Sequence, residues 1–345
     1  MSSPAVIQQN WIKTESAGLT VDTGQTRFVI DAFRPSPLAV ITHGHADHAR
    51  AGHDHVIATP ETLAIMAARY GENFTKKQTS LAYGQSLDLG DVRITLEPAG
   101  HVLGSAQIVI DHGGLRVVAS GDYKRKSDPT CTPFKPVPCD IFITEATFAL
   151  PVFSHPDPMG EIEKLLGSLK LFPERCHVIG AYSLGKAQRL IALLRQAGYN
   201  EAIYLHGAQQ KLCTLYQDLG VDLGMLLPAT AGEKGQARED LRGRIVIAPP
   251  SALNDKWSRR LPDPLIILAS GWMQIRQRAK QSGVELPLIL SDHADWHDLL
   301  RTIDDVTPRE VWVTHGREDA LIHALGLRGI TARALSLVGY EDDAE

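Results

Sequence analysis

The chain has 345 residues, which is long enough for two domains of ordinary size or for one core with a large insertion. Hydrophobic residues make up 43% and charged residues 22%, and the net charge of −5 excludes a surface that is basic throughout. No apolar run approaches the roughly 20 residues that span a bilayer, and residues 1–18 lack the pattern of a secretory signal. We therefore expect no membrane association and a cytoplasmic location.

Short β-branched runs dominate the first 150 residues, with one helix between them at Pro60–Tyr70. Turn residues bound most of these runs, so the pattern predicts a sheet of largely adjacent strands with helices packed outside. The predicted strands are Arg27–Asp31, Leu38–Thr42, Val92–Pro98, Ala106–Asp111, Leu115–Asp122 and Asp140–Thr147.

From about residue 155 strands alternate with helices, which predicts a second, parallel α/β sheet. The predicted strands there are His177–Tyr182, Ala202–Leu205, Arg244–Pro249 and Leu265–Ser270, and the helices are Ala187–Ala197 and Gln209–Leu219. The segment Ala229–Arg244 is rich in Gly and charge and is the expected mobile loop. Strands at Pro287–Ser291 and Glu310–Thr314 follow, each leading to a His and then a helix.

Four cysteines lie far apart without a C-x-x-C pair, which favours four reduced thiols over a disulfide or cysteine–metal framework. They are Cys131, Cys139, Cys176 and Cys213.

The strongest functional signal comes directly after the strand that precedes Thr42. Three imidazoles and a carboxylate, from His43, His45, Asp47 and His48, stand within six residues around a glycine. A turn that brings them together offers the nitrogen and oxygen ligands that borderline divalent metals prefer. Three more residues beside glycines follow later strands and are candidates for the same rim, namely His101, Asp122 and His315.

These residues resemble the metallo-β-lactamase superfamily, whose signature is His-x-His-x-Asp-His with a distant His and a distant Asp. The resemblance extends to the β-CASP branch of nucleic-acid nucleases, through an acidic residue after a strand (Glu145), the segment Ser291–Asp295 around His293, and the final His315. The stretches 41–50 and 181–188 are similar to bacterial ligase-associated DNA exonucleases. Asp292 stands where the family more often has a small residue, and Ala146 replaces a frequent Ser.

The resemblance implies an α/β fold, the metallo-β-lactamase αββα sandwich with an inserted α/β β-CASP domain. The sandwich would comprise residues 1–150 and 286–345, and the insertion residues 151–285. It also implies two divalent ions, expected to be Zn²⁺ with Mn²⁺ as the alternative. One ion would be held by His43, His45, His101 and Asp122. The other would be held by Asp47, His48 and His315, with Asp122 bridging and Asp31 orienting a ligand imidazole.

Within that resemblance, the catalytic residues would be Asp47, His293 and Glu145. His293 would be a general acid or a hydrogen-bond donor to the phosphate, and Glu145 would be its partner. Substrate contacts are expected from Lys124, Arg125, Ser183 and Lys186. Basic clusters near Trp257 and Trp272 mix cations with aromatics as single-strand binders do. A surface carboxylate is the alternative for Glu145, and solvated charge is the alternative for the clusters.

The expected function is phosphodiester hydrolysis in nucleic acid by a metal-dependent nuclease, and specifically a DNA exonuclease of DNA repair acting on single-stranded DNA. By resemblance, its partners would include DNA ligase and helicase repair proteins. Three alternatives stay open: an RNA-processing nuclease of the same fold, a hydrolase of small esters, lactones or thioesters, and a non-catalytic scaffold. The retained ligand positions argue against the scaffold.

Overall fold

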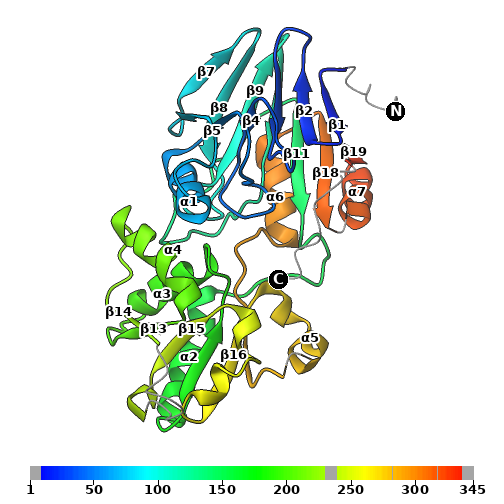
Figure 1. Cartoon of the computed structure of the whole chain (residues 1–345). Helices are drawn as coiled ribbons and strands as arrows, with labels where there is room; N and C mark the ends of the chain where they lie inside the picture. The colour runs from blue at the N-terminus through cyan, green and yellow to red at the C-terminus, as the bar shows by residue number, and fades with distance from the viewer. Residues whose placement is uncertain (1–8, 230–238, 282, 317, 336–345) are drawn as a thin grey trace. The chain divides into compact units, whose positions relative to one another are not determined.

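The computed structural model describes residues 9–229, 239–281, 283–316 and 318–335, except for the side chains of Glu239 and His315. Figure 1 labels its elements along the chain. The described residues divide into two compact units, one formed by those within 9–154 and 293–335 and the other by those within 155–292. Each is α/β, with mixed strand directions in the first unit and parallel strands throughout the second.

The first unit contains two sheets. One has the order β1-β2-β3-β4-β5-β6, formed by Ile12–Glu15, Gly18–Asp22, Arg27–Ile30, Ala39–Val40, His55–Ala58 and Lys77–Ser80. The other has the order β19-β18-β11-β10-β9-β8-β7, formed by Thr331–Ala334, Glu310–Gly316, Ile141–Ala146, Leu115–Ala119, Ala106–His112, Val92–Pro98 and Ser86–Leu89. One buried core cluster joins Val21 and Phe28 of the first sheet to Ile94, Ile110 and Trp312 of the second, so the sheets share an apolar interior.

The helices of this unit cover the other face of each sheet. Since successive side chains of a strand point to opposite faces, Val117 enters the shared core while Val118 packs against α6 (Trp296–Val306) and α7 (Glu318–Leu327). Helix α1 (Pro60–Tyr70) packs through Leu63 and Met66 on the first sheet. Its bounds agree with the predicted helix. Thr59 caps its first turn, accepting from the amide of Thr62, and Pro60 occupies the position where no amide is needed.

The second unit is a single sheet of parallel strands in the order β14-β13-β15-β12-β16-β17, which confirms the predicted parallel sheet. The strands are Leu226–Pro228, Ile203–Leu205, Ile245–Ala248, Cys176–Gly180, Pro264–Ala269 and Leu286–Leu288. Its helices are α2 (Pro158–Leu171), α3 (Lys186–Gln196), α4 (Gly207–Asp218) and α5 (Arg276–Gln281). The strand expected within Pro287–Ser291 thus pairs with β16 of this sheet, and the contact boundary falls between Asp292 and His293.

Other expectations concern single segments. Residues 230–238 of the expected mobile loop lie outside the described residues. All four cysteines are free thiols. Within the described ranges, no helix is both long enough and apolar enough to cross a membrane.

Candidate metal centre

The candidate residues gather where several strands end at one edge. Strands β8 and β10 both run antiparallel to β9, and β11 is parallel to β10, so β8, β10 and β11 share one direction. Their carboxyl ends therefore lie at the same edge of the sheet, where His101 follows β8, Asp122 follows β10 and Glu145 stands near the end of β11. The loop after β4 joins them, because the amide of Ala106 donates to the carbonyl of Thr42 at 2.8 Å.

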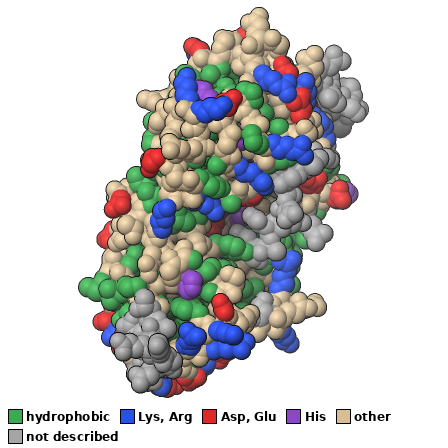
Figure 2. Space-filling model, in the orientation of Figure 1, with side chains coloured by type: hydrophobic (Ala, Val, Ile, Leu, Met, Phe, Trp, Pro, Cys, Tyr) green, Lys and Arg blue, Asp and Glu red, His purple; other side chains and the backbone are tan. Residues whose placement is uncertain are grey.

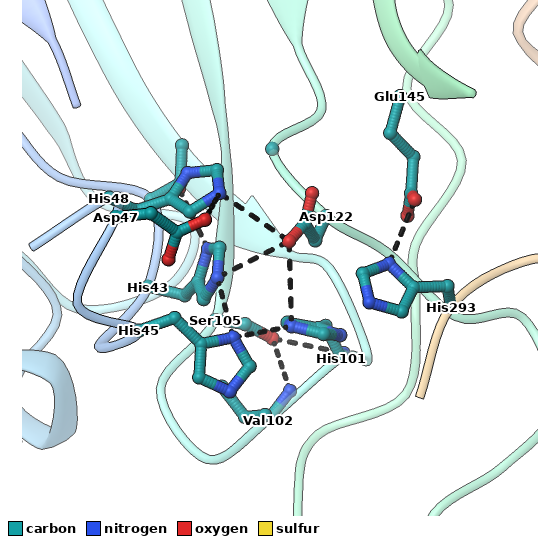
Figure 3. A network of polar contacts seen from close by, with 12 residues as sticks. His43, His45, Asp47, His48, His101, Val102, Ser105, Asp122, Glu145 and His293 are labelled. Atoms are coloured by element: carbon teal, nitrogen blue, oxygen red, sulfur yellow. Dashed lines mark hydrogen bonds and ion pairs between the residues drawn. The ribbon is translucent and has the colours of Figure 1, made fainter. Parts of the chain in front are cut away.

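Three imidazoles converge at this edge (Figure 3). The Nδ1 atom of His45 lies 3.0 Å from Nε2 of His43 and 3.1 Å from Nε2 of His101. With one oxygen of Asp122, these atoms form a group whose members all lie within 4.8 Å of one another. The fold thus brings residues as far apart in the sequence as His43 and Asp122 together, so that their potential metal-binding atoms form one compact group.

Asp122 occupies the middle of the cluster. Its Oδ2 atom lies 3.5 Å from Nε2 of His43, 3.5 Å from Nε2 of His48 and 3.8 Å from Nε2 of His101 (Figure 3). Asp47 reaches the same region, since its Oδ2 is 3.3 Å from Nε2 of His48. A single carboxylate oxygen therefore faces the ring nitrogens of both expected ligand sets.

Asp31 and Thr42 fix which ring nitrogens face the cluster. One oxygen of Asp31 accepts from the amide of Thr42 at 2.7 Å, and the other lies 2.6 Å from the Thr42 hydroxyl and 2.8 Å from Nδ1 of His48. Because an ionised carboxylate only accepts, the hydroxyl donates to Asp31 and must accept from Nδ1 of His43, 3.0 Å away. Both His43 and His48 thus carry a proton on Nδ1 and direct Nε2 towards Asp122.

Without a cation, burial and neighbouring charges shift the pKa values of the clustered residues in different directions. Burial raises the pKa of Asp122 to about 7. Burial also lowers the pKa of His43, and the neighbouring imidazoles of His48 and His101 lower it further. Burial alone would lower the pKa of His48 as well, but Asp122, Asp47 and Asp31 outweigh it and hold that pKa well above its ordinary value.

The donor set fits a divalent cation. At most one proton can lie between each pair of ring nitrogens, whereas a cation among them accepts a lone pair from every ring at once. Imidazole nitrogens with carboxylate oxygens are the ligands that Zn²⁺ and similar ions take in proteins. Asp31 supplies the carboxylate behind a ligand imidazole that such sites commonly contain.

Beside this cluster lies a pair formed by His293 and Glu145. The Nδ1 atom of His293 is 2.8 Å from Oε2 of Glu145, and both residues are buried. Glu145 also accepts from the amide of Tyr123 at 2.7 Å and from the hydroxyl of Thr147 at 2.5 Å, so its orientation is fixed. The His293 ring packs on the His101 ring with their centroids 4.7 Å apart. The alternative of a surface carboxylate at Glu145 is wrong, because only 1% of this residue is exposed.

The predicted substrate residues of the first unit make contacts within the protein. The amino group of Lys124 is 3.5 Å from the carbonyl of His293. The guanidinium of Arg125 binds Asp305 at 2.6 Å and lies over the ring of Phe134. On the face seen in Figure 2, Lys and Arg side chains form several separate groups with hydrophobic and acidic side chains between them. The predicted DNA contacts stay predictions.

Three further predicted residues are Ser183, Lys186 and His315. Ser183 and Lys186 belong to the second unit, at the start of α3. His315 lies in β18, and its side chain is outside the described part of the chain, so its expected role as a ligand stays a prediction.

Sequence reasoning assigned no role to two residues that hold the site. Thr42 links Asp31 to His43, and the hydroxyl of Ser105 accepts from the amides of His101 and Val102 at 3.0 and 3.2 Å. Their one available signal was position, since Thr42 directly precedes His43 and Ser105 follows Gly104 four residues after His101.

Comparison with known proteins gives relatives over much of the chain. No family model matches it. A protein of Opitutus terrae named "Probable DNA ligase" is 30% identical over 321 residues, which cover 89% of this chain and 29% of that protein. The Endoribonuclease ysh-1 of Neurospora crassa is 30% identical over 206 residues, covering 48% of this chain and 24% of that protein. The Cleavage and polyadenylation specificity factor 73 of Drosophila melanogaster is 24% identical over 296 residues, which cover 71% of this chain and 43% of that protein.

The chain therefore spans less than half the length of each of these relatives. Among solved structures, a protein of unknown function from Enterococcus faecalis shares the fold over 95% of this chain and 98% of its own, with a TM-score of 0.57 and 14% sequence identity.

Proposed function

Because the chain belongs to the β-CASP branch of the metallo-β-lactamase superfamily, we propose that it is a metal-dependent nuclease that hydrolyses phosphodiester bonds in DNA. The observation that carries this proposal is the convergence of His43, His45, His101 and Asp122 beside the buried His293–Glu145 pair. Metal ions bound there would activate a water and stabilise the phosphate charge, and a histidine held by a carboxylate would supply a proton; phosphodiester hydrolysis needs both.

We assign one divalent ion to His43, His45, His101 and Asp122, and a second to Asp47, His48 and His315 with Asp122 shared. The central position of Asp122 Oδ2 among the three imidazoles supports the shared role. When bound, two such ions would supply an activated water and neutralise charge on the phosphate. The histidine-rich donor set favours Zn²⁺, with Mn²⁺ as the alternative.

His293 is the proposed general acid or the hydrogen-bond donor to the phosphate. Its Nδ1 proton is directed to Glu145, whose other contacts come from Tyr123 and Thr147. Nε2 is then the ring atom that would donate to a phosphate oxygen or to the departing oxygen. Glu145 holds the ring in place and stabilises the imidazolium form, which carries a proton on both nitrogens.

DNA is the proposed substrate because a match over 89% of this chain is to a protein named "Probable DNA ligase". The relatives named as endoribonucleases favour RNA as the second candidate. We further propose exonuclease action in DNA repair, a cytoplasmic location, and association with ligase and helicase repair proteins. We also propose that the two-sheet unit is the metallo-β-lactamase αββα sandwich, with the second unit as its inserted β-CASP domain; the shared core and outer helices support this.

The test uses DNA and RNA of one sequence, single- and double-stranded, labelled at either end. Each is incubated with metal-free protein alone and after addition of Zn²⁺, Mn²⁺ or Mg²⁺. We expect no cleavage before metal is added. After addition, we expect single-stranded DNA to shorten from one end, and elemental analysis to find two ions per chain.

A His43→Ala variant purified in parallel controls for contaminating nucleases and should be inactive. Cleavage of RNA alone would replace the DNA proposal with the RNA candidate. Hydrolysis of small esters without cleavage of any nucleic acid would overturn the nuclease proposal.

A further inference from the structure

Asp292, directly before His293, forms a buried ionic cluster within the second unit. Its Oδ2 lies 3.5 Å from Nζ of Lys186 and its Oδ1 lies 3.5 Å from a guanidinium nitrogen of Arg189. The same guanidinium nitrogen donates to the carbonyl of Ser291. Both cations come from the first turns of α3, three residues apart, so they lie on the same face of that helix.

Burial makes these contacts strong constraints. The side chains of Asp292, Lys186 and Arg189 are 4%, 1% and 3% exposed. Removing one member of a buried ion pair leaves the charge of its partner uncompensated, so the surrounding chain shifts to relieve it. Arg189 binds the backbone carbonyl of Ser291 as well as the Asp292 carboxylate, and this fixes the chain over two consecutive residues.

The next two residues are fixed by contacts within the first unit. His293 donates to Glu145, and the amide of Ala294 donates to the carbonyl of Tyr123 at 2.7 Å. The peptide bond between Asp292 and His293 is therefore the point where the chain passes from one unit to the other. The position of the His293 ring depends on the constraints on both sides of this bond.

We propose that Asp292, held by Lys186 and Arg189, is a positioning residue that fixes His293 for catalysis. This inference rests on the proposed nuclease function. In this role the carboxylate acts through the backbone and not on a reacting group. It fixes the backbone immediately before His293, and a misplacement of about 1 Å at a reacting group costs on the order of a hundredfold in rate.

The kinetic test compares Asp292→Asn, Arg189→Met and the double variant on single-stranded DNA at saturating metal. We expect kcat of each single variant to fall about 10- to 100-fold, while KM and bound metal stay near wild type. Because both substitutions break the same contact, the double variant should be no slower than the slower single variant.

A matched control is Glu161→Gln, another buried carboxylate of the second unit, which accepts from the amide of Ile289 at 2.9 Å in the same chain segment. This variant should lower thermal stability as Asp292→Asn does, while kcat stays unchanged. An equal fall of kcat in the control would reduce the role of Asp292 to general stability and overturn the proposal.

The second readout needs no activity. The proton between Nδ1 of His293 and Glu145 should give a downfield imidazole signal in NMR spectra, assigned by its loss in His293→Gln. Asp292→Asn should shift or broaden that signal, and Glu161→Gln should not. An unchanged signal in Asp292→Asn would overturn the positioning role. If wild type cleaves no nucleic acid while the signal responds as expected, the nuclease proposal fails and the positioning of His293 by Asp292 stands.

Discussion

Asp31 accepts a hydrogen bond from Nδ1 of His48 at 2.8 Å, and this bond places Nε2 of the same ring 3.5 Å from Asp122. Through the hydroxyl of Thr42, Asp31 also determines the orientation of His43. One buried carboxylate thus sets the tautomer of two rings that belong to different proposed metal sites. Asp31 has φ 47°, in the left-handed region that residues other than Gly, Asn and Asp rarely adopt.

Asp31→Asn is expected to weaken metal binding at both sites. Asn tolerates the left-handed backbone, so the change removes the charge without straining the chain. An amide also offers one acceptor oxygen in place of two, so either the Thr42 amide or the Thr42 hydroxyl and His48 lose their acceptor. We expect metal affinity to fall about 10- to 100-fold, measured by competition with a chromophoric chelator. The control is Asp22→Asn, which changes a surface carboxylate, 24% exposed, that pairs with Arg27; it should bind metal as wild type does.

His293 and Asp47 should separate catalysis from metal binding. Asp47→Ala removes a proposed ligand and is expected to reduce both bound metal and cleavage. His293→Gln is expected to lower kcat by about 10² to 10⁴ through loss of proton transfer while two ions stay bound. Elemental analysis beside single-turnover cleavage distinguishes the two variants. Full activity in His293→Gln would remove its catalytic role, and metal loss in that variant would make His293 a ligand.

The convergence of the proposed ligand positions could be predicted because each follows a strand, and strands of one direction place their ends at one edge. His43, His45, His101 and Asp122 lie in one group of possible metal-binding atoms. The relays were not predictable, because Thr42 and Ser105 are ordinary polar residues whose roles depend on contacts across 11 positions in one case and on a tight local turn in the other.

The same limit applies to the fold. Helix α1 was predicted to the residue because Thr59, Pro60 and Gly71 mark its ends. A strand was predicted at Pro287–Ser291 and the structure has one at Leu286–Leu288, but its partner was not predicted, since an apolar run carries no information on which sheet it joins. The contacts of Asp292 with Lys186 were likewise invisible in the sequence, where the two residues stand far apart.

Gly121 should be essential to the centre for a steric reason. It has φ +55°, and a Cβ there would lie 2.8 Å from Cβ of Thr42, which links Asp31 to His43. Gly121→Ala is expected to displace Thr42, costing about 1–3 kcal/mol of stability from overpacking and weakening metal binding. Gly113→Ala is the matched control, because Gly113 has φ +57° and no atom within 4 Å of the added Cβ. Gly113→Ala should lose only the stability that a side chain costs in the left-handed backbone conformation. Equal loss of metal in both variants would contradict the steric explanation.

His177 should make the stability of the second unit depend on pH. It is fully buried in β12, with Nε2 2.9 Å from the hydroxyl of Ser168, and burial lowers its pKa. The unfolded chain therefore binds the proton more tightly, so the contribution of His177 to stability is complete above the unfolded pKa of about 6.5 and is lost as pH falls below it. One such group changes the free energy of unfolding by at most about 1.4 kcal/mol per pH unit. In His177→Leu this slope between pH 7 and 5 should be reduced, as measured by hydrogen exchange of the β12 amides. A slope equal to that of wild type would mean that His177 stays neutral or charged equally in both states.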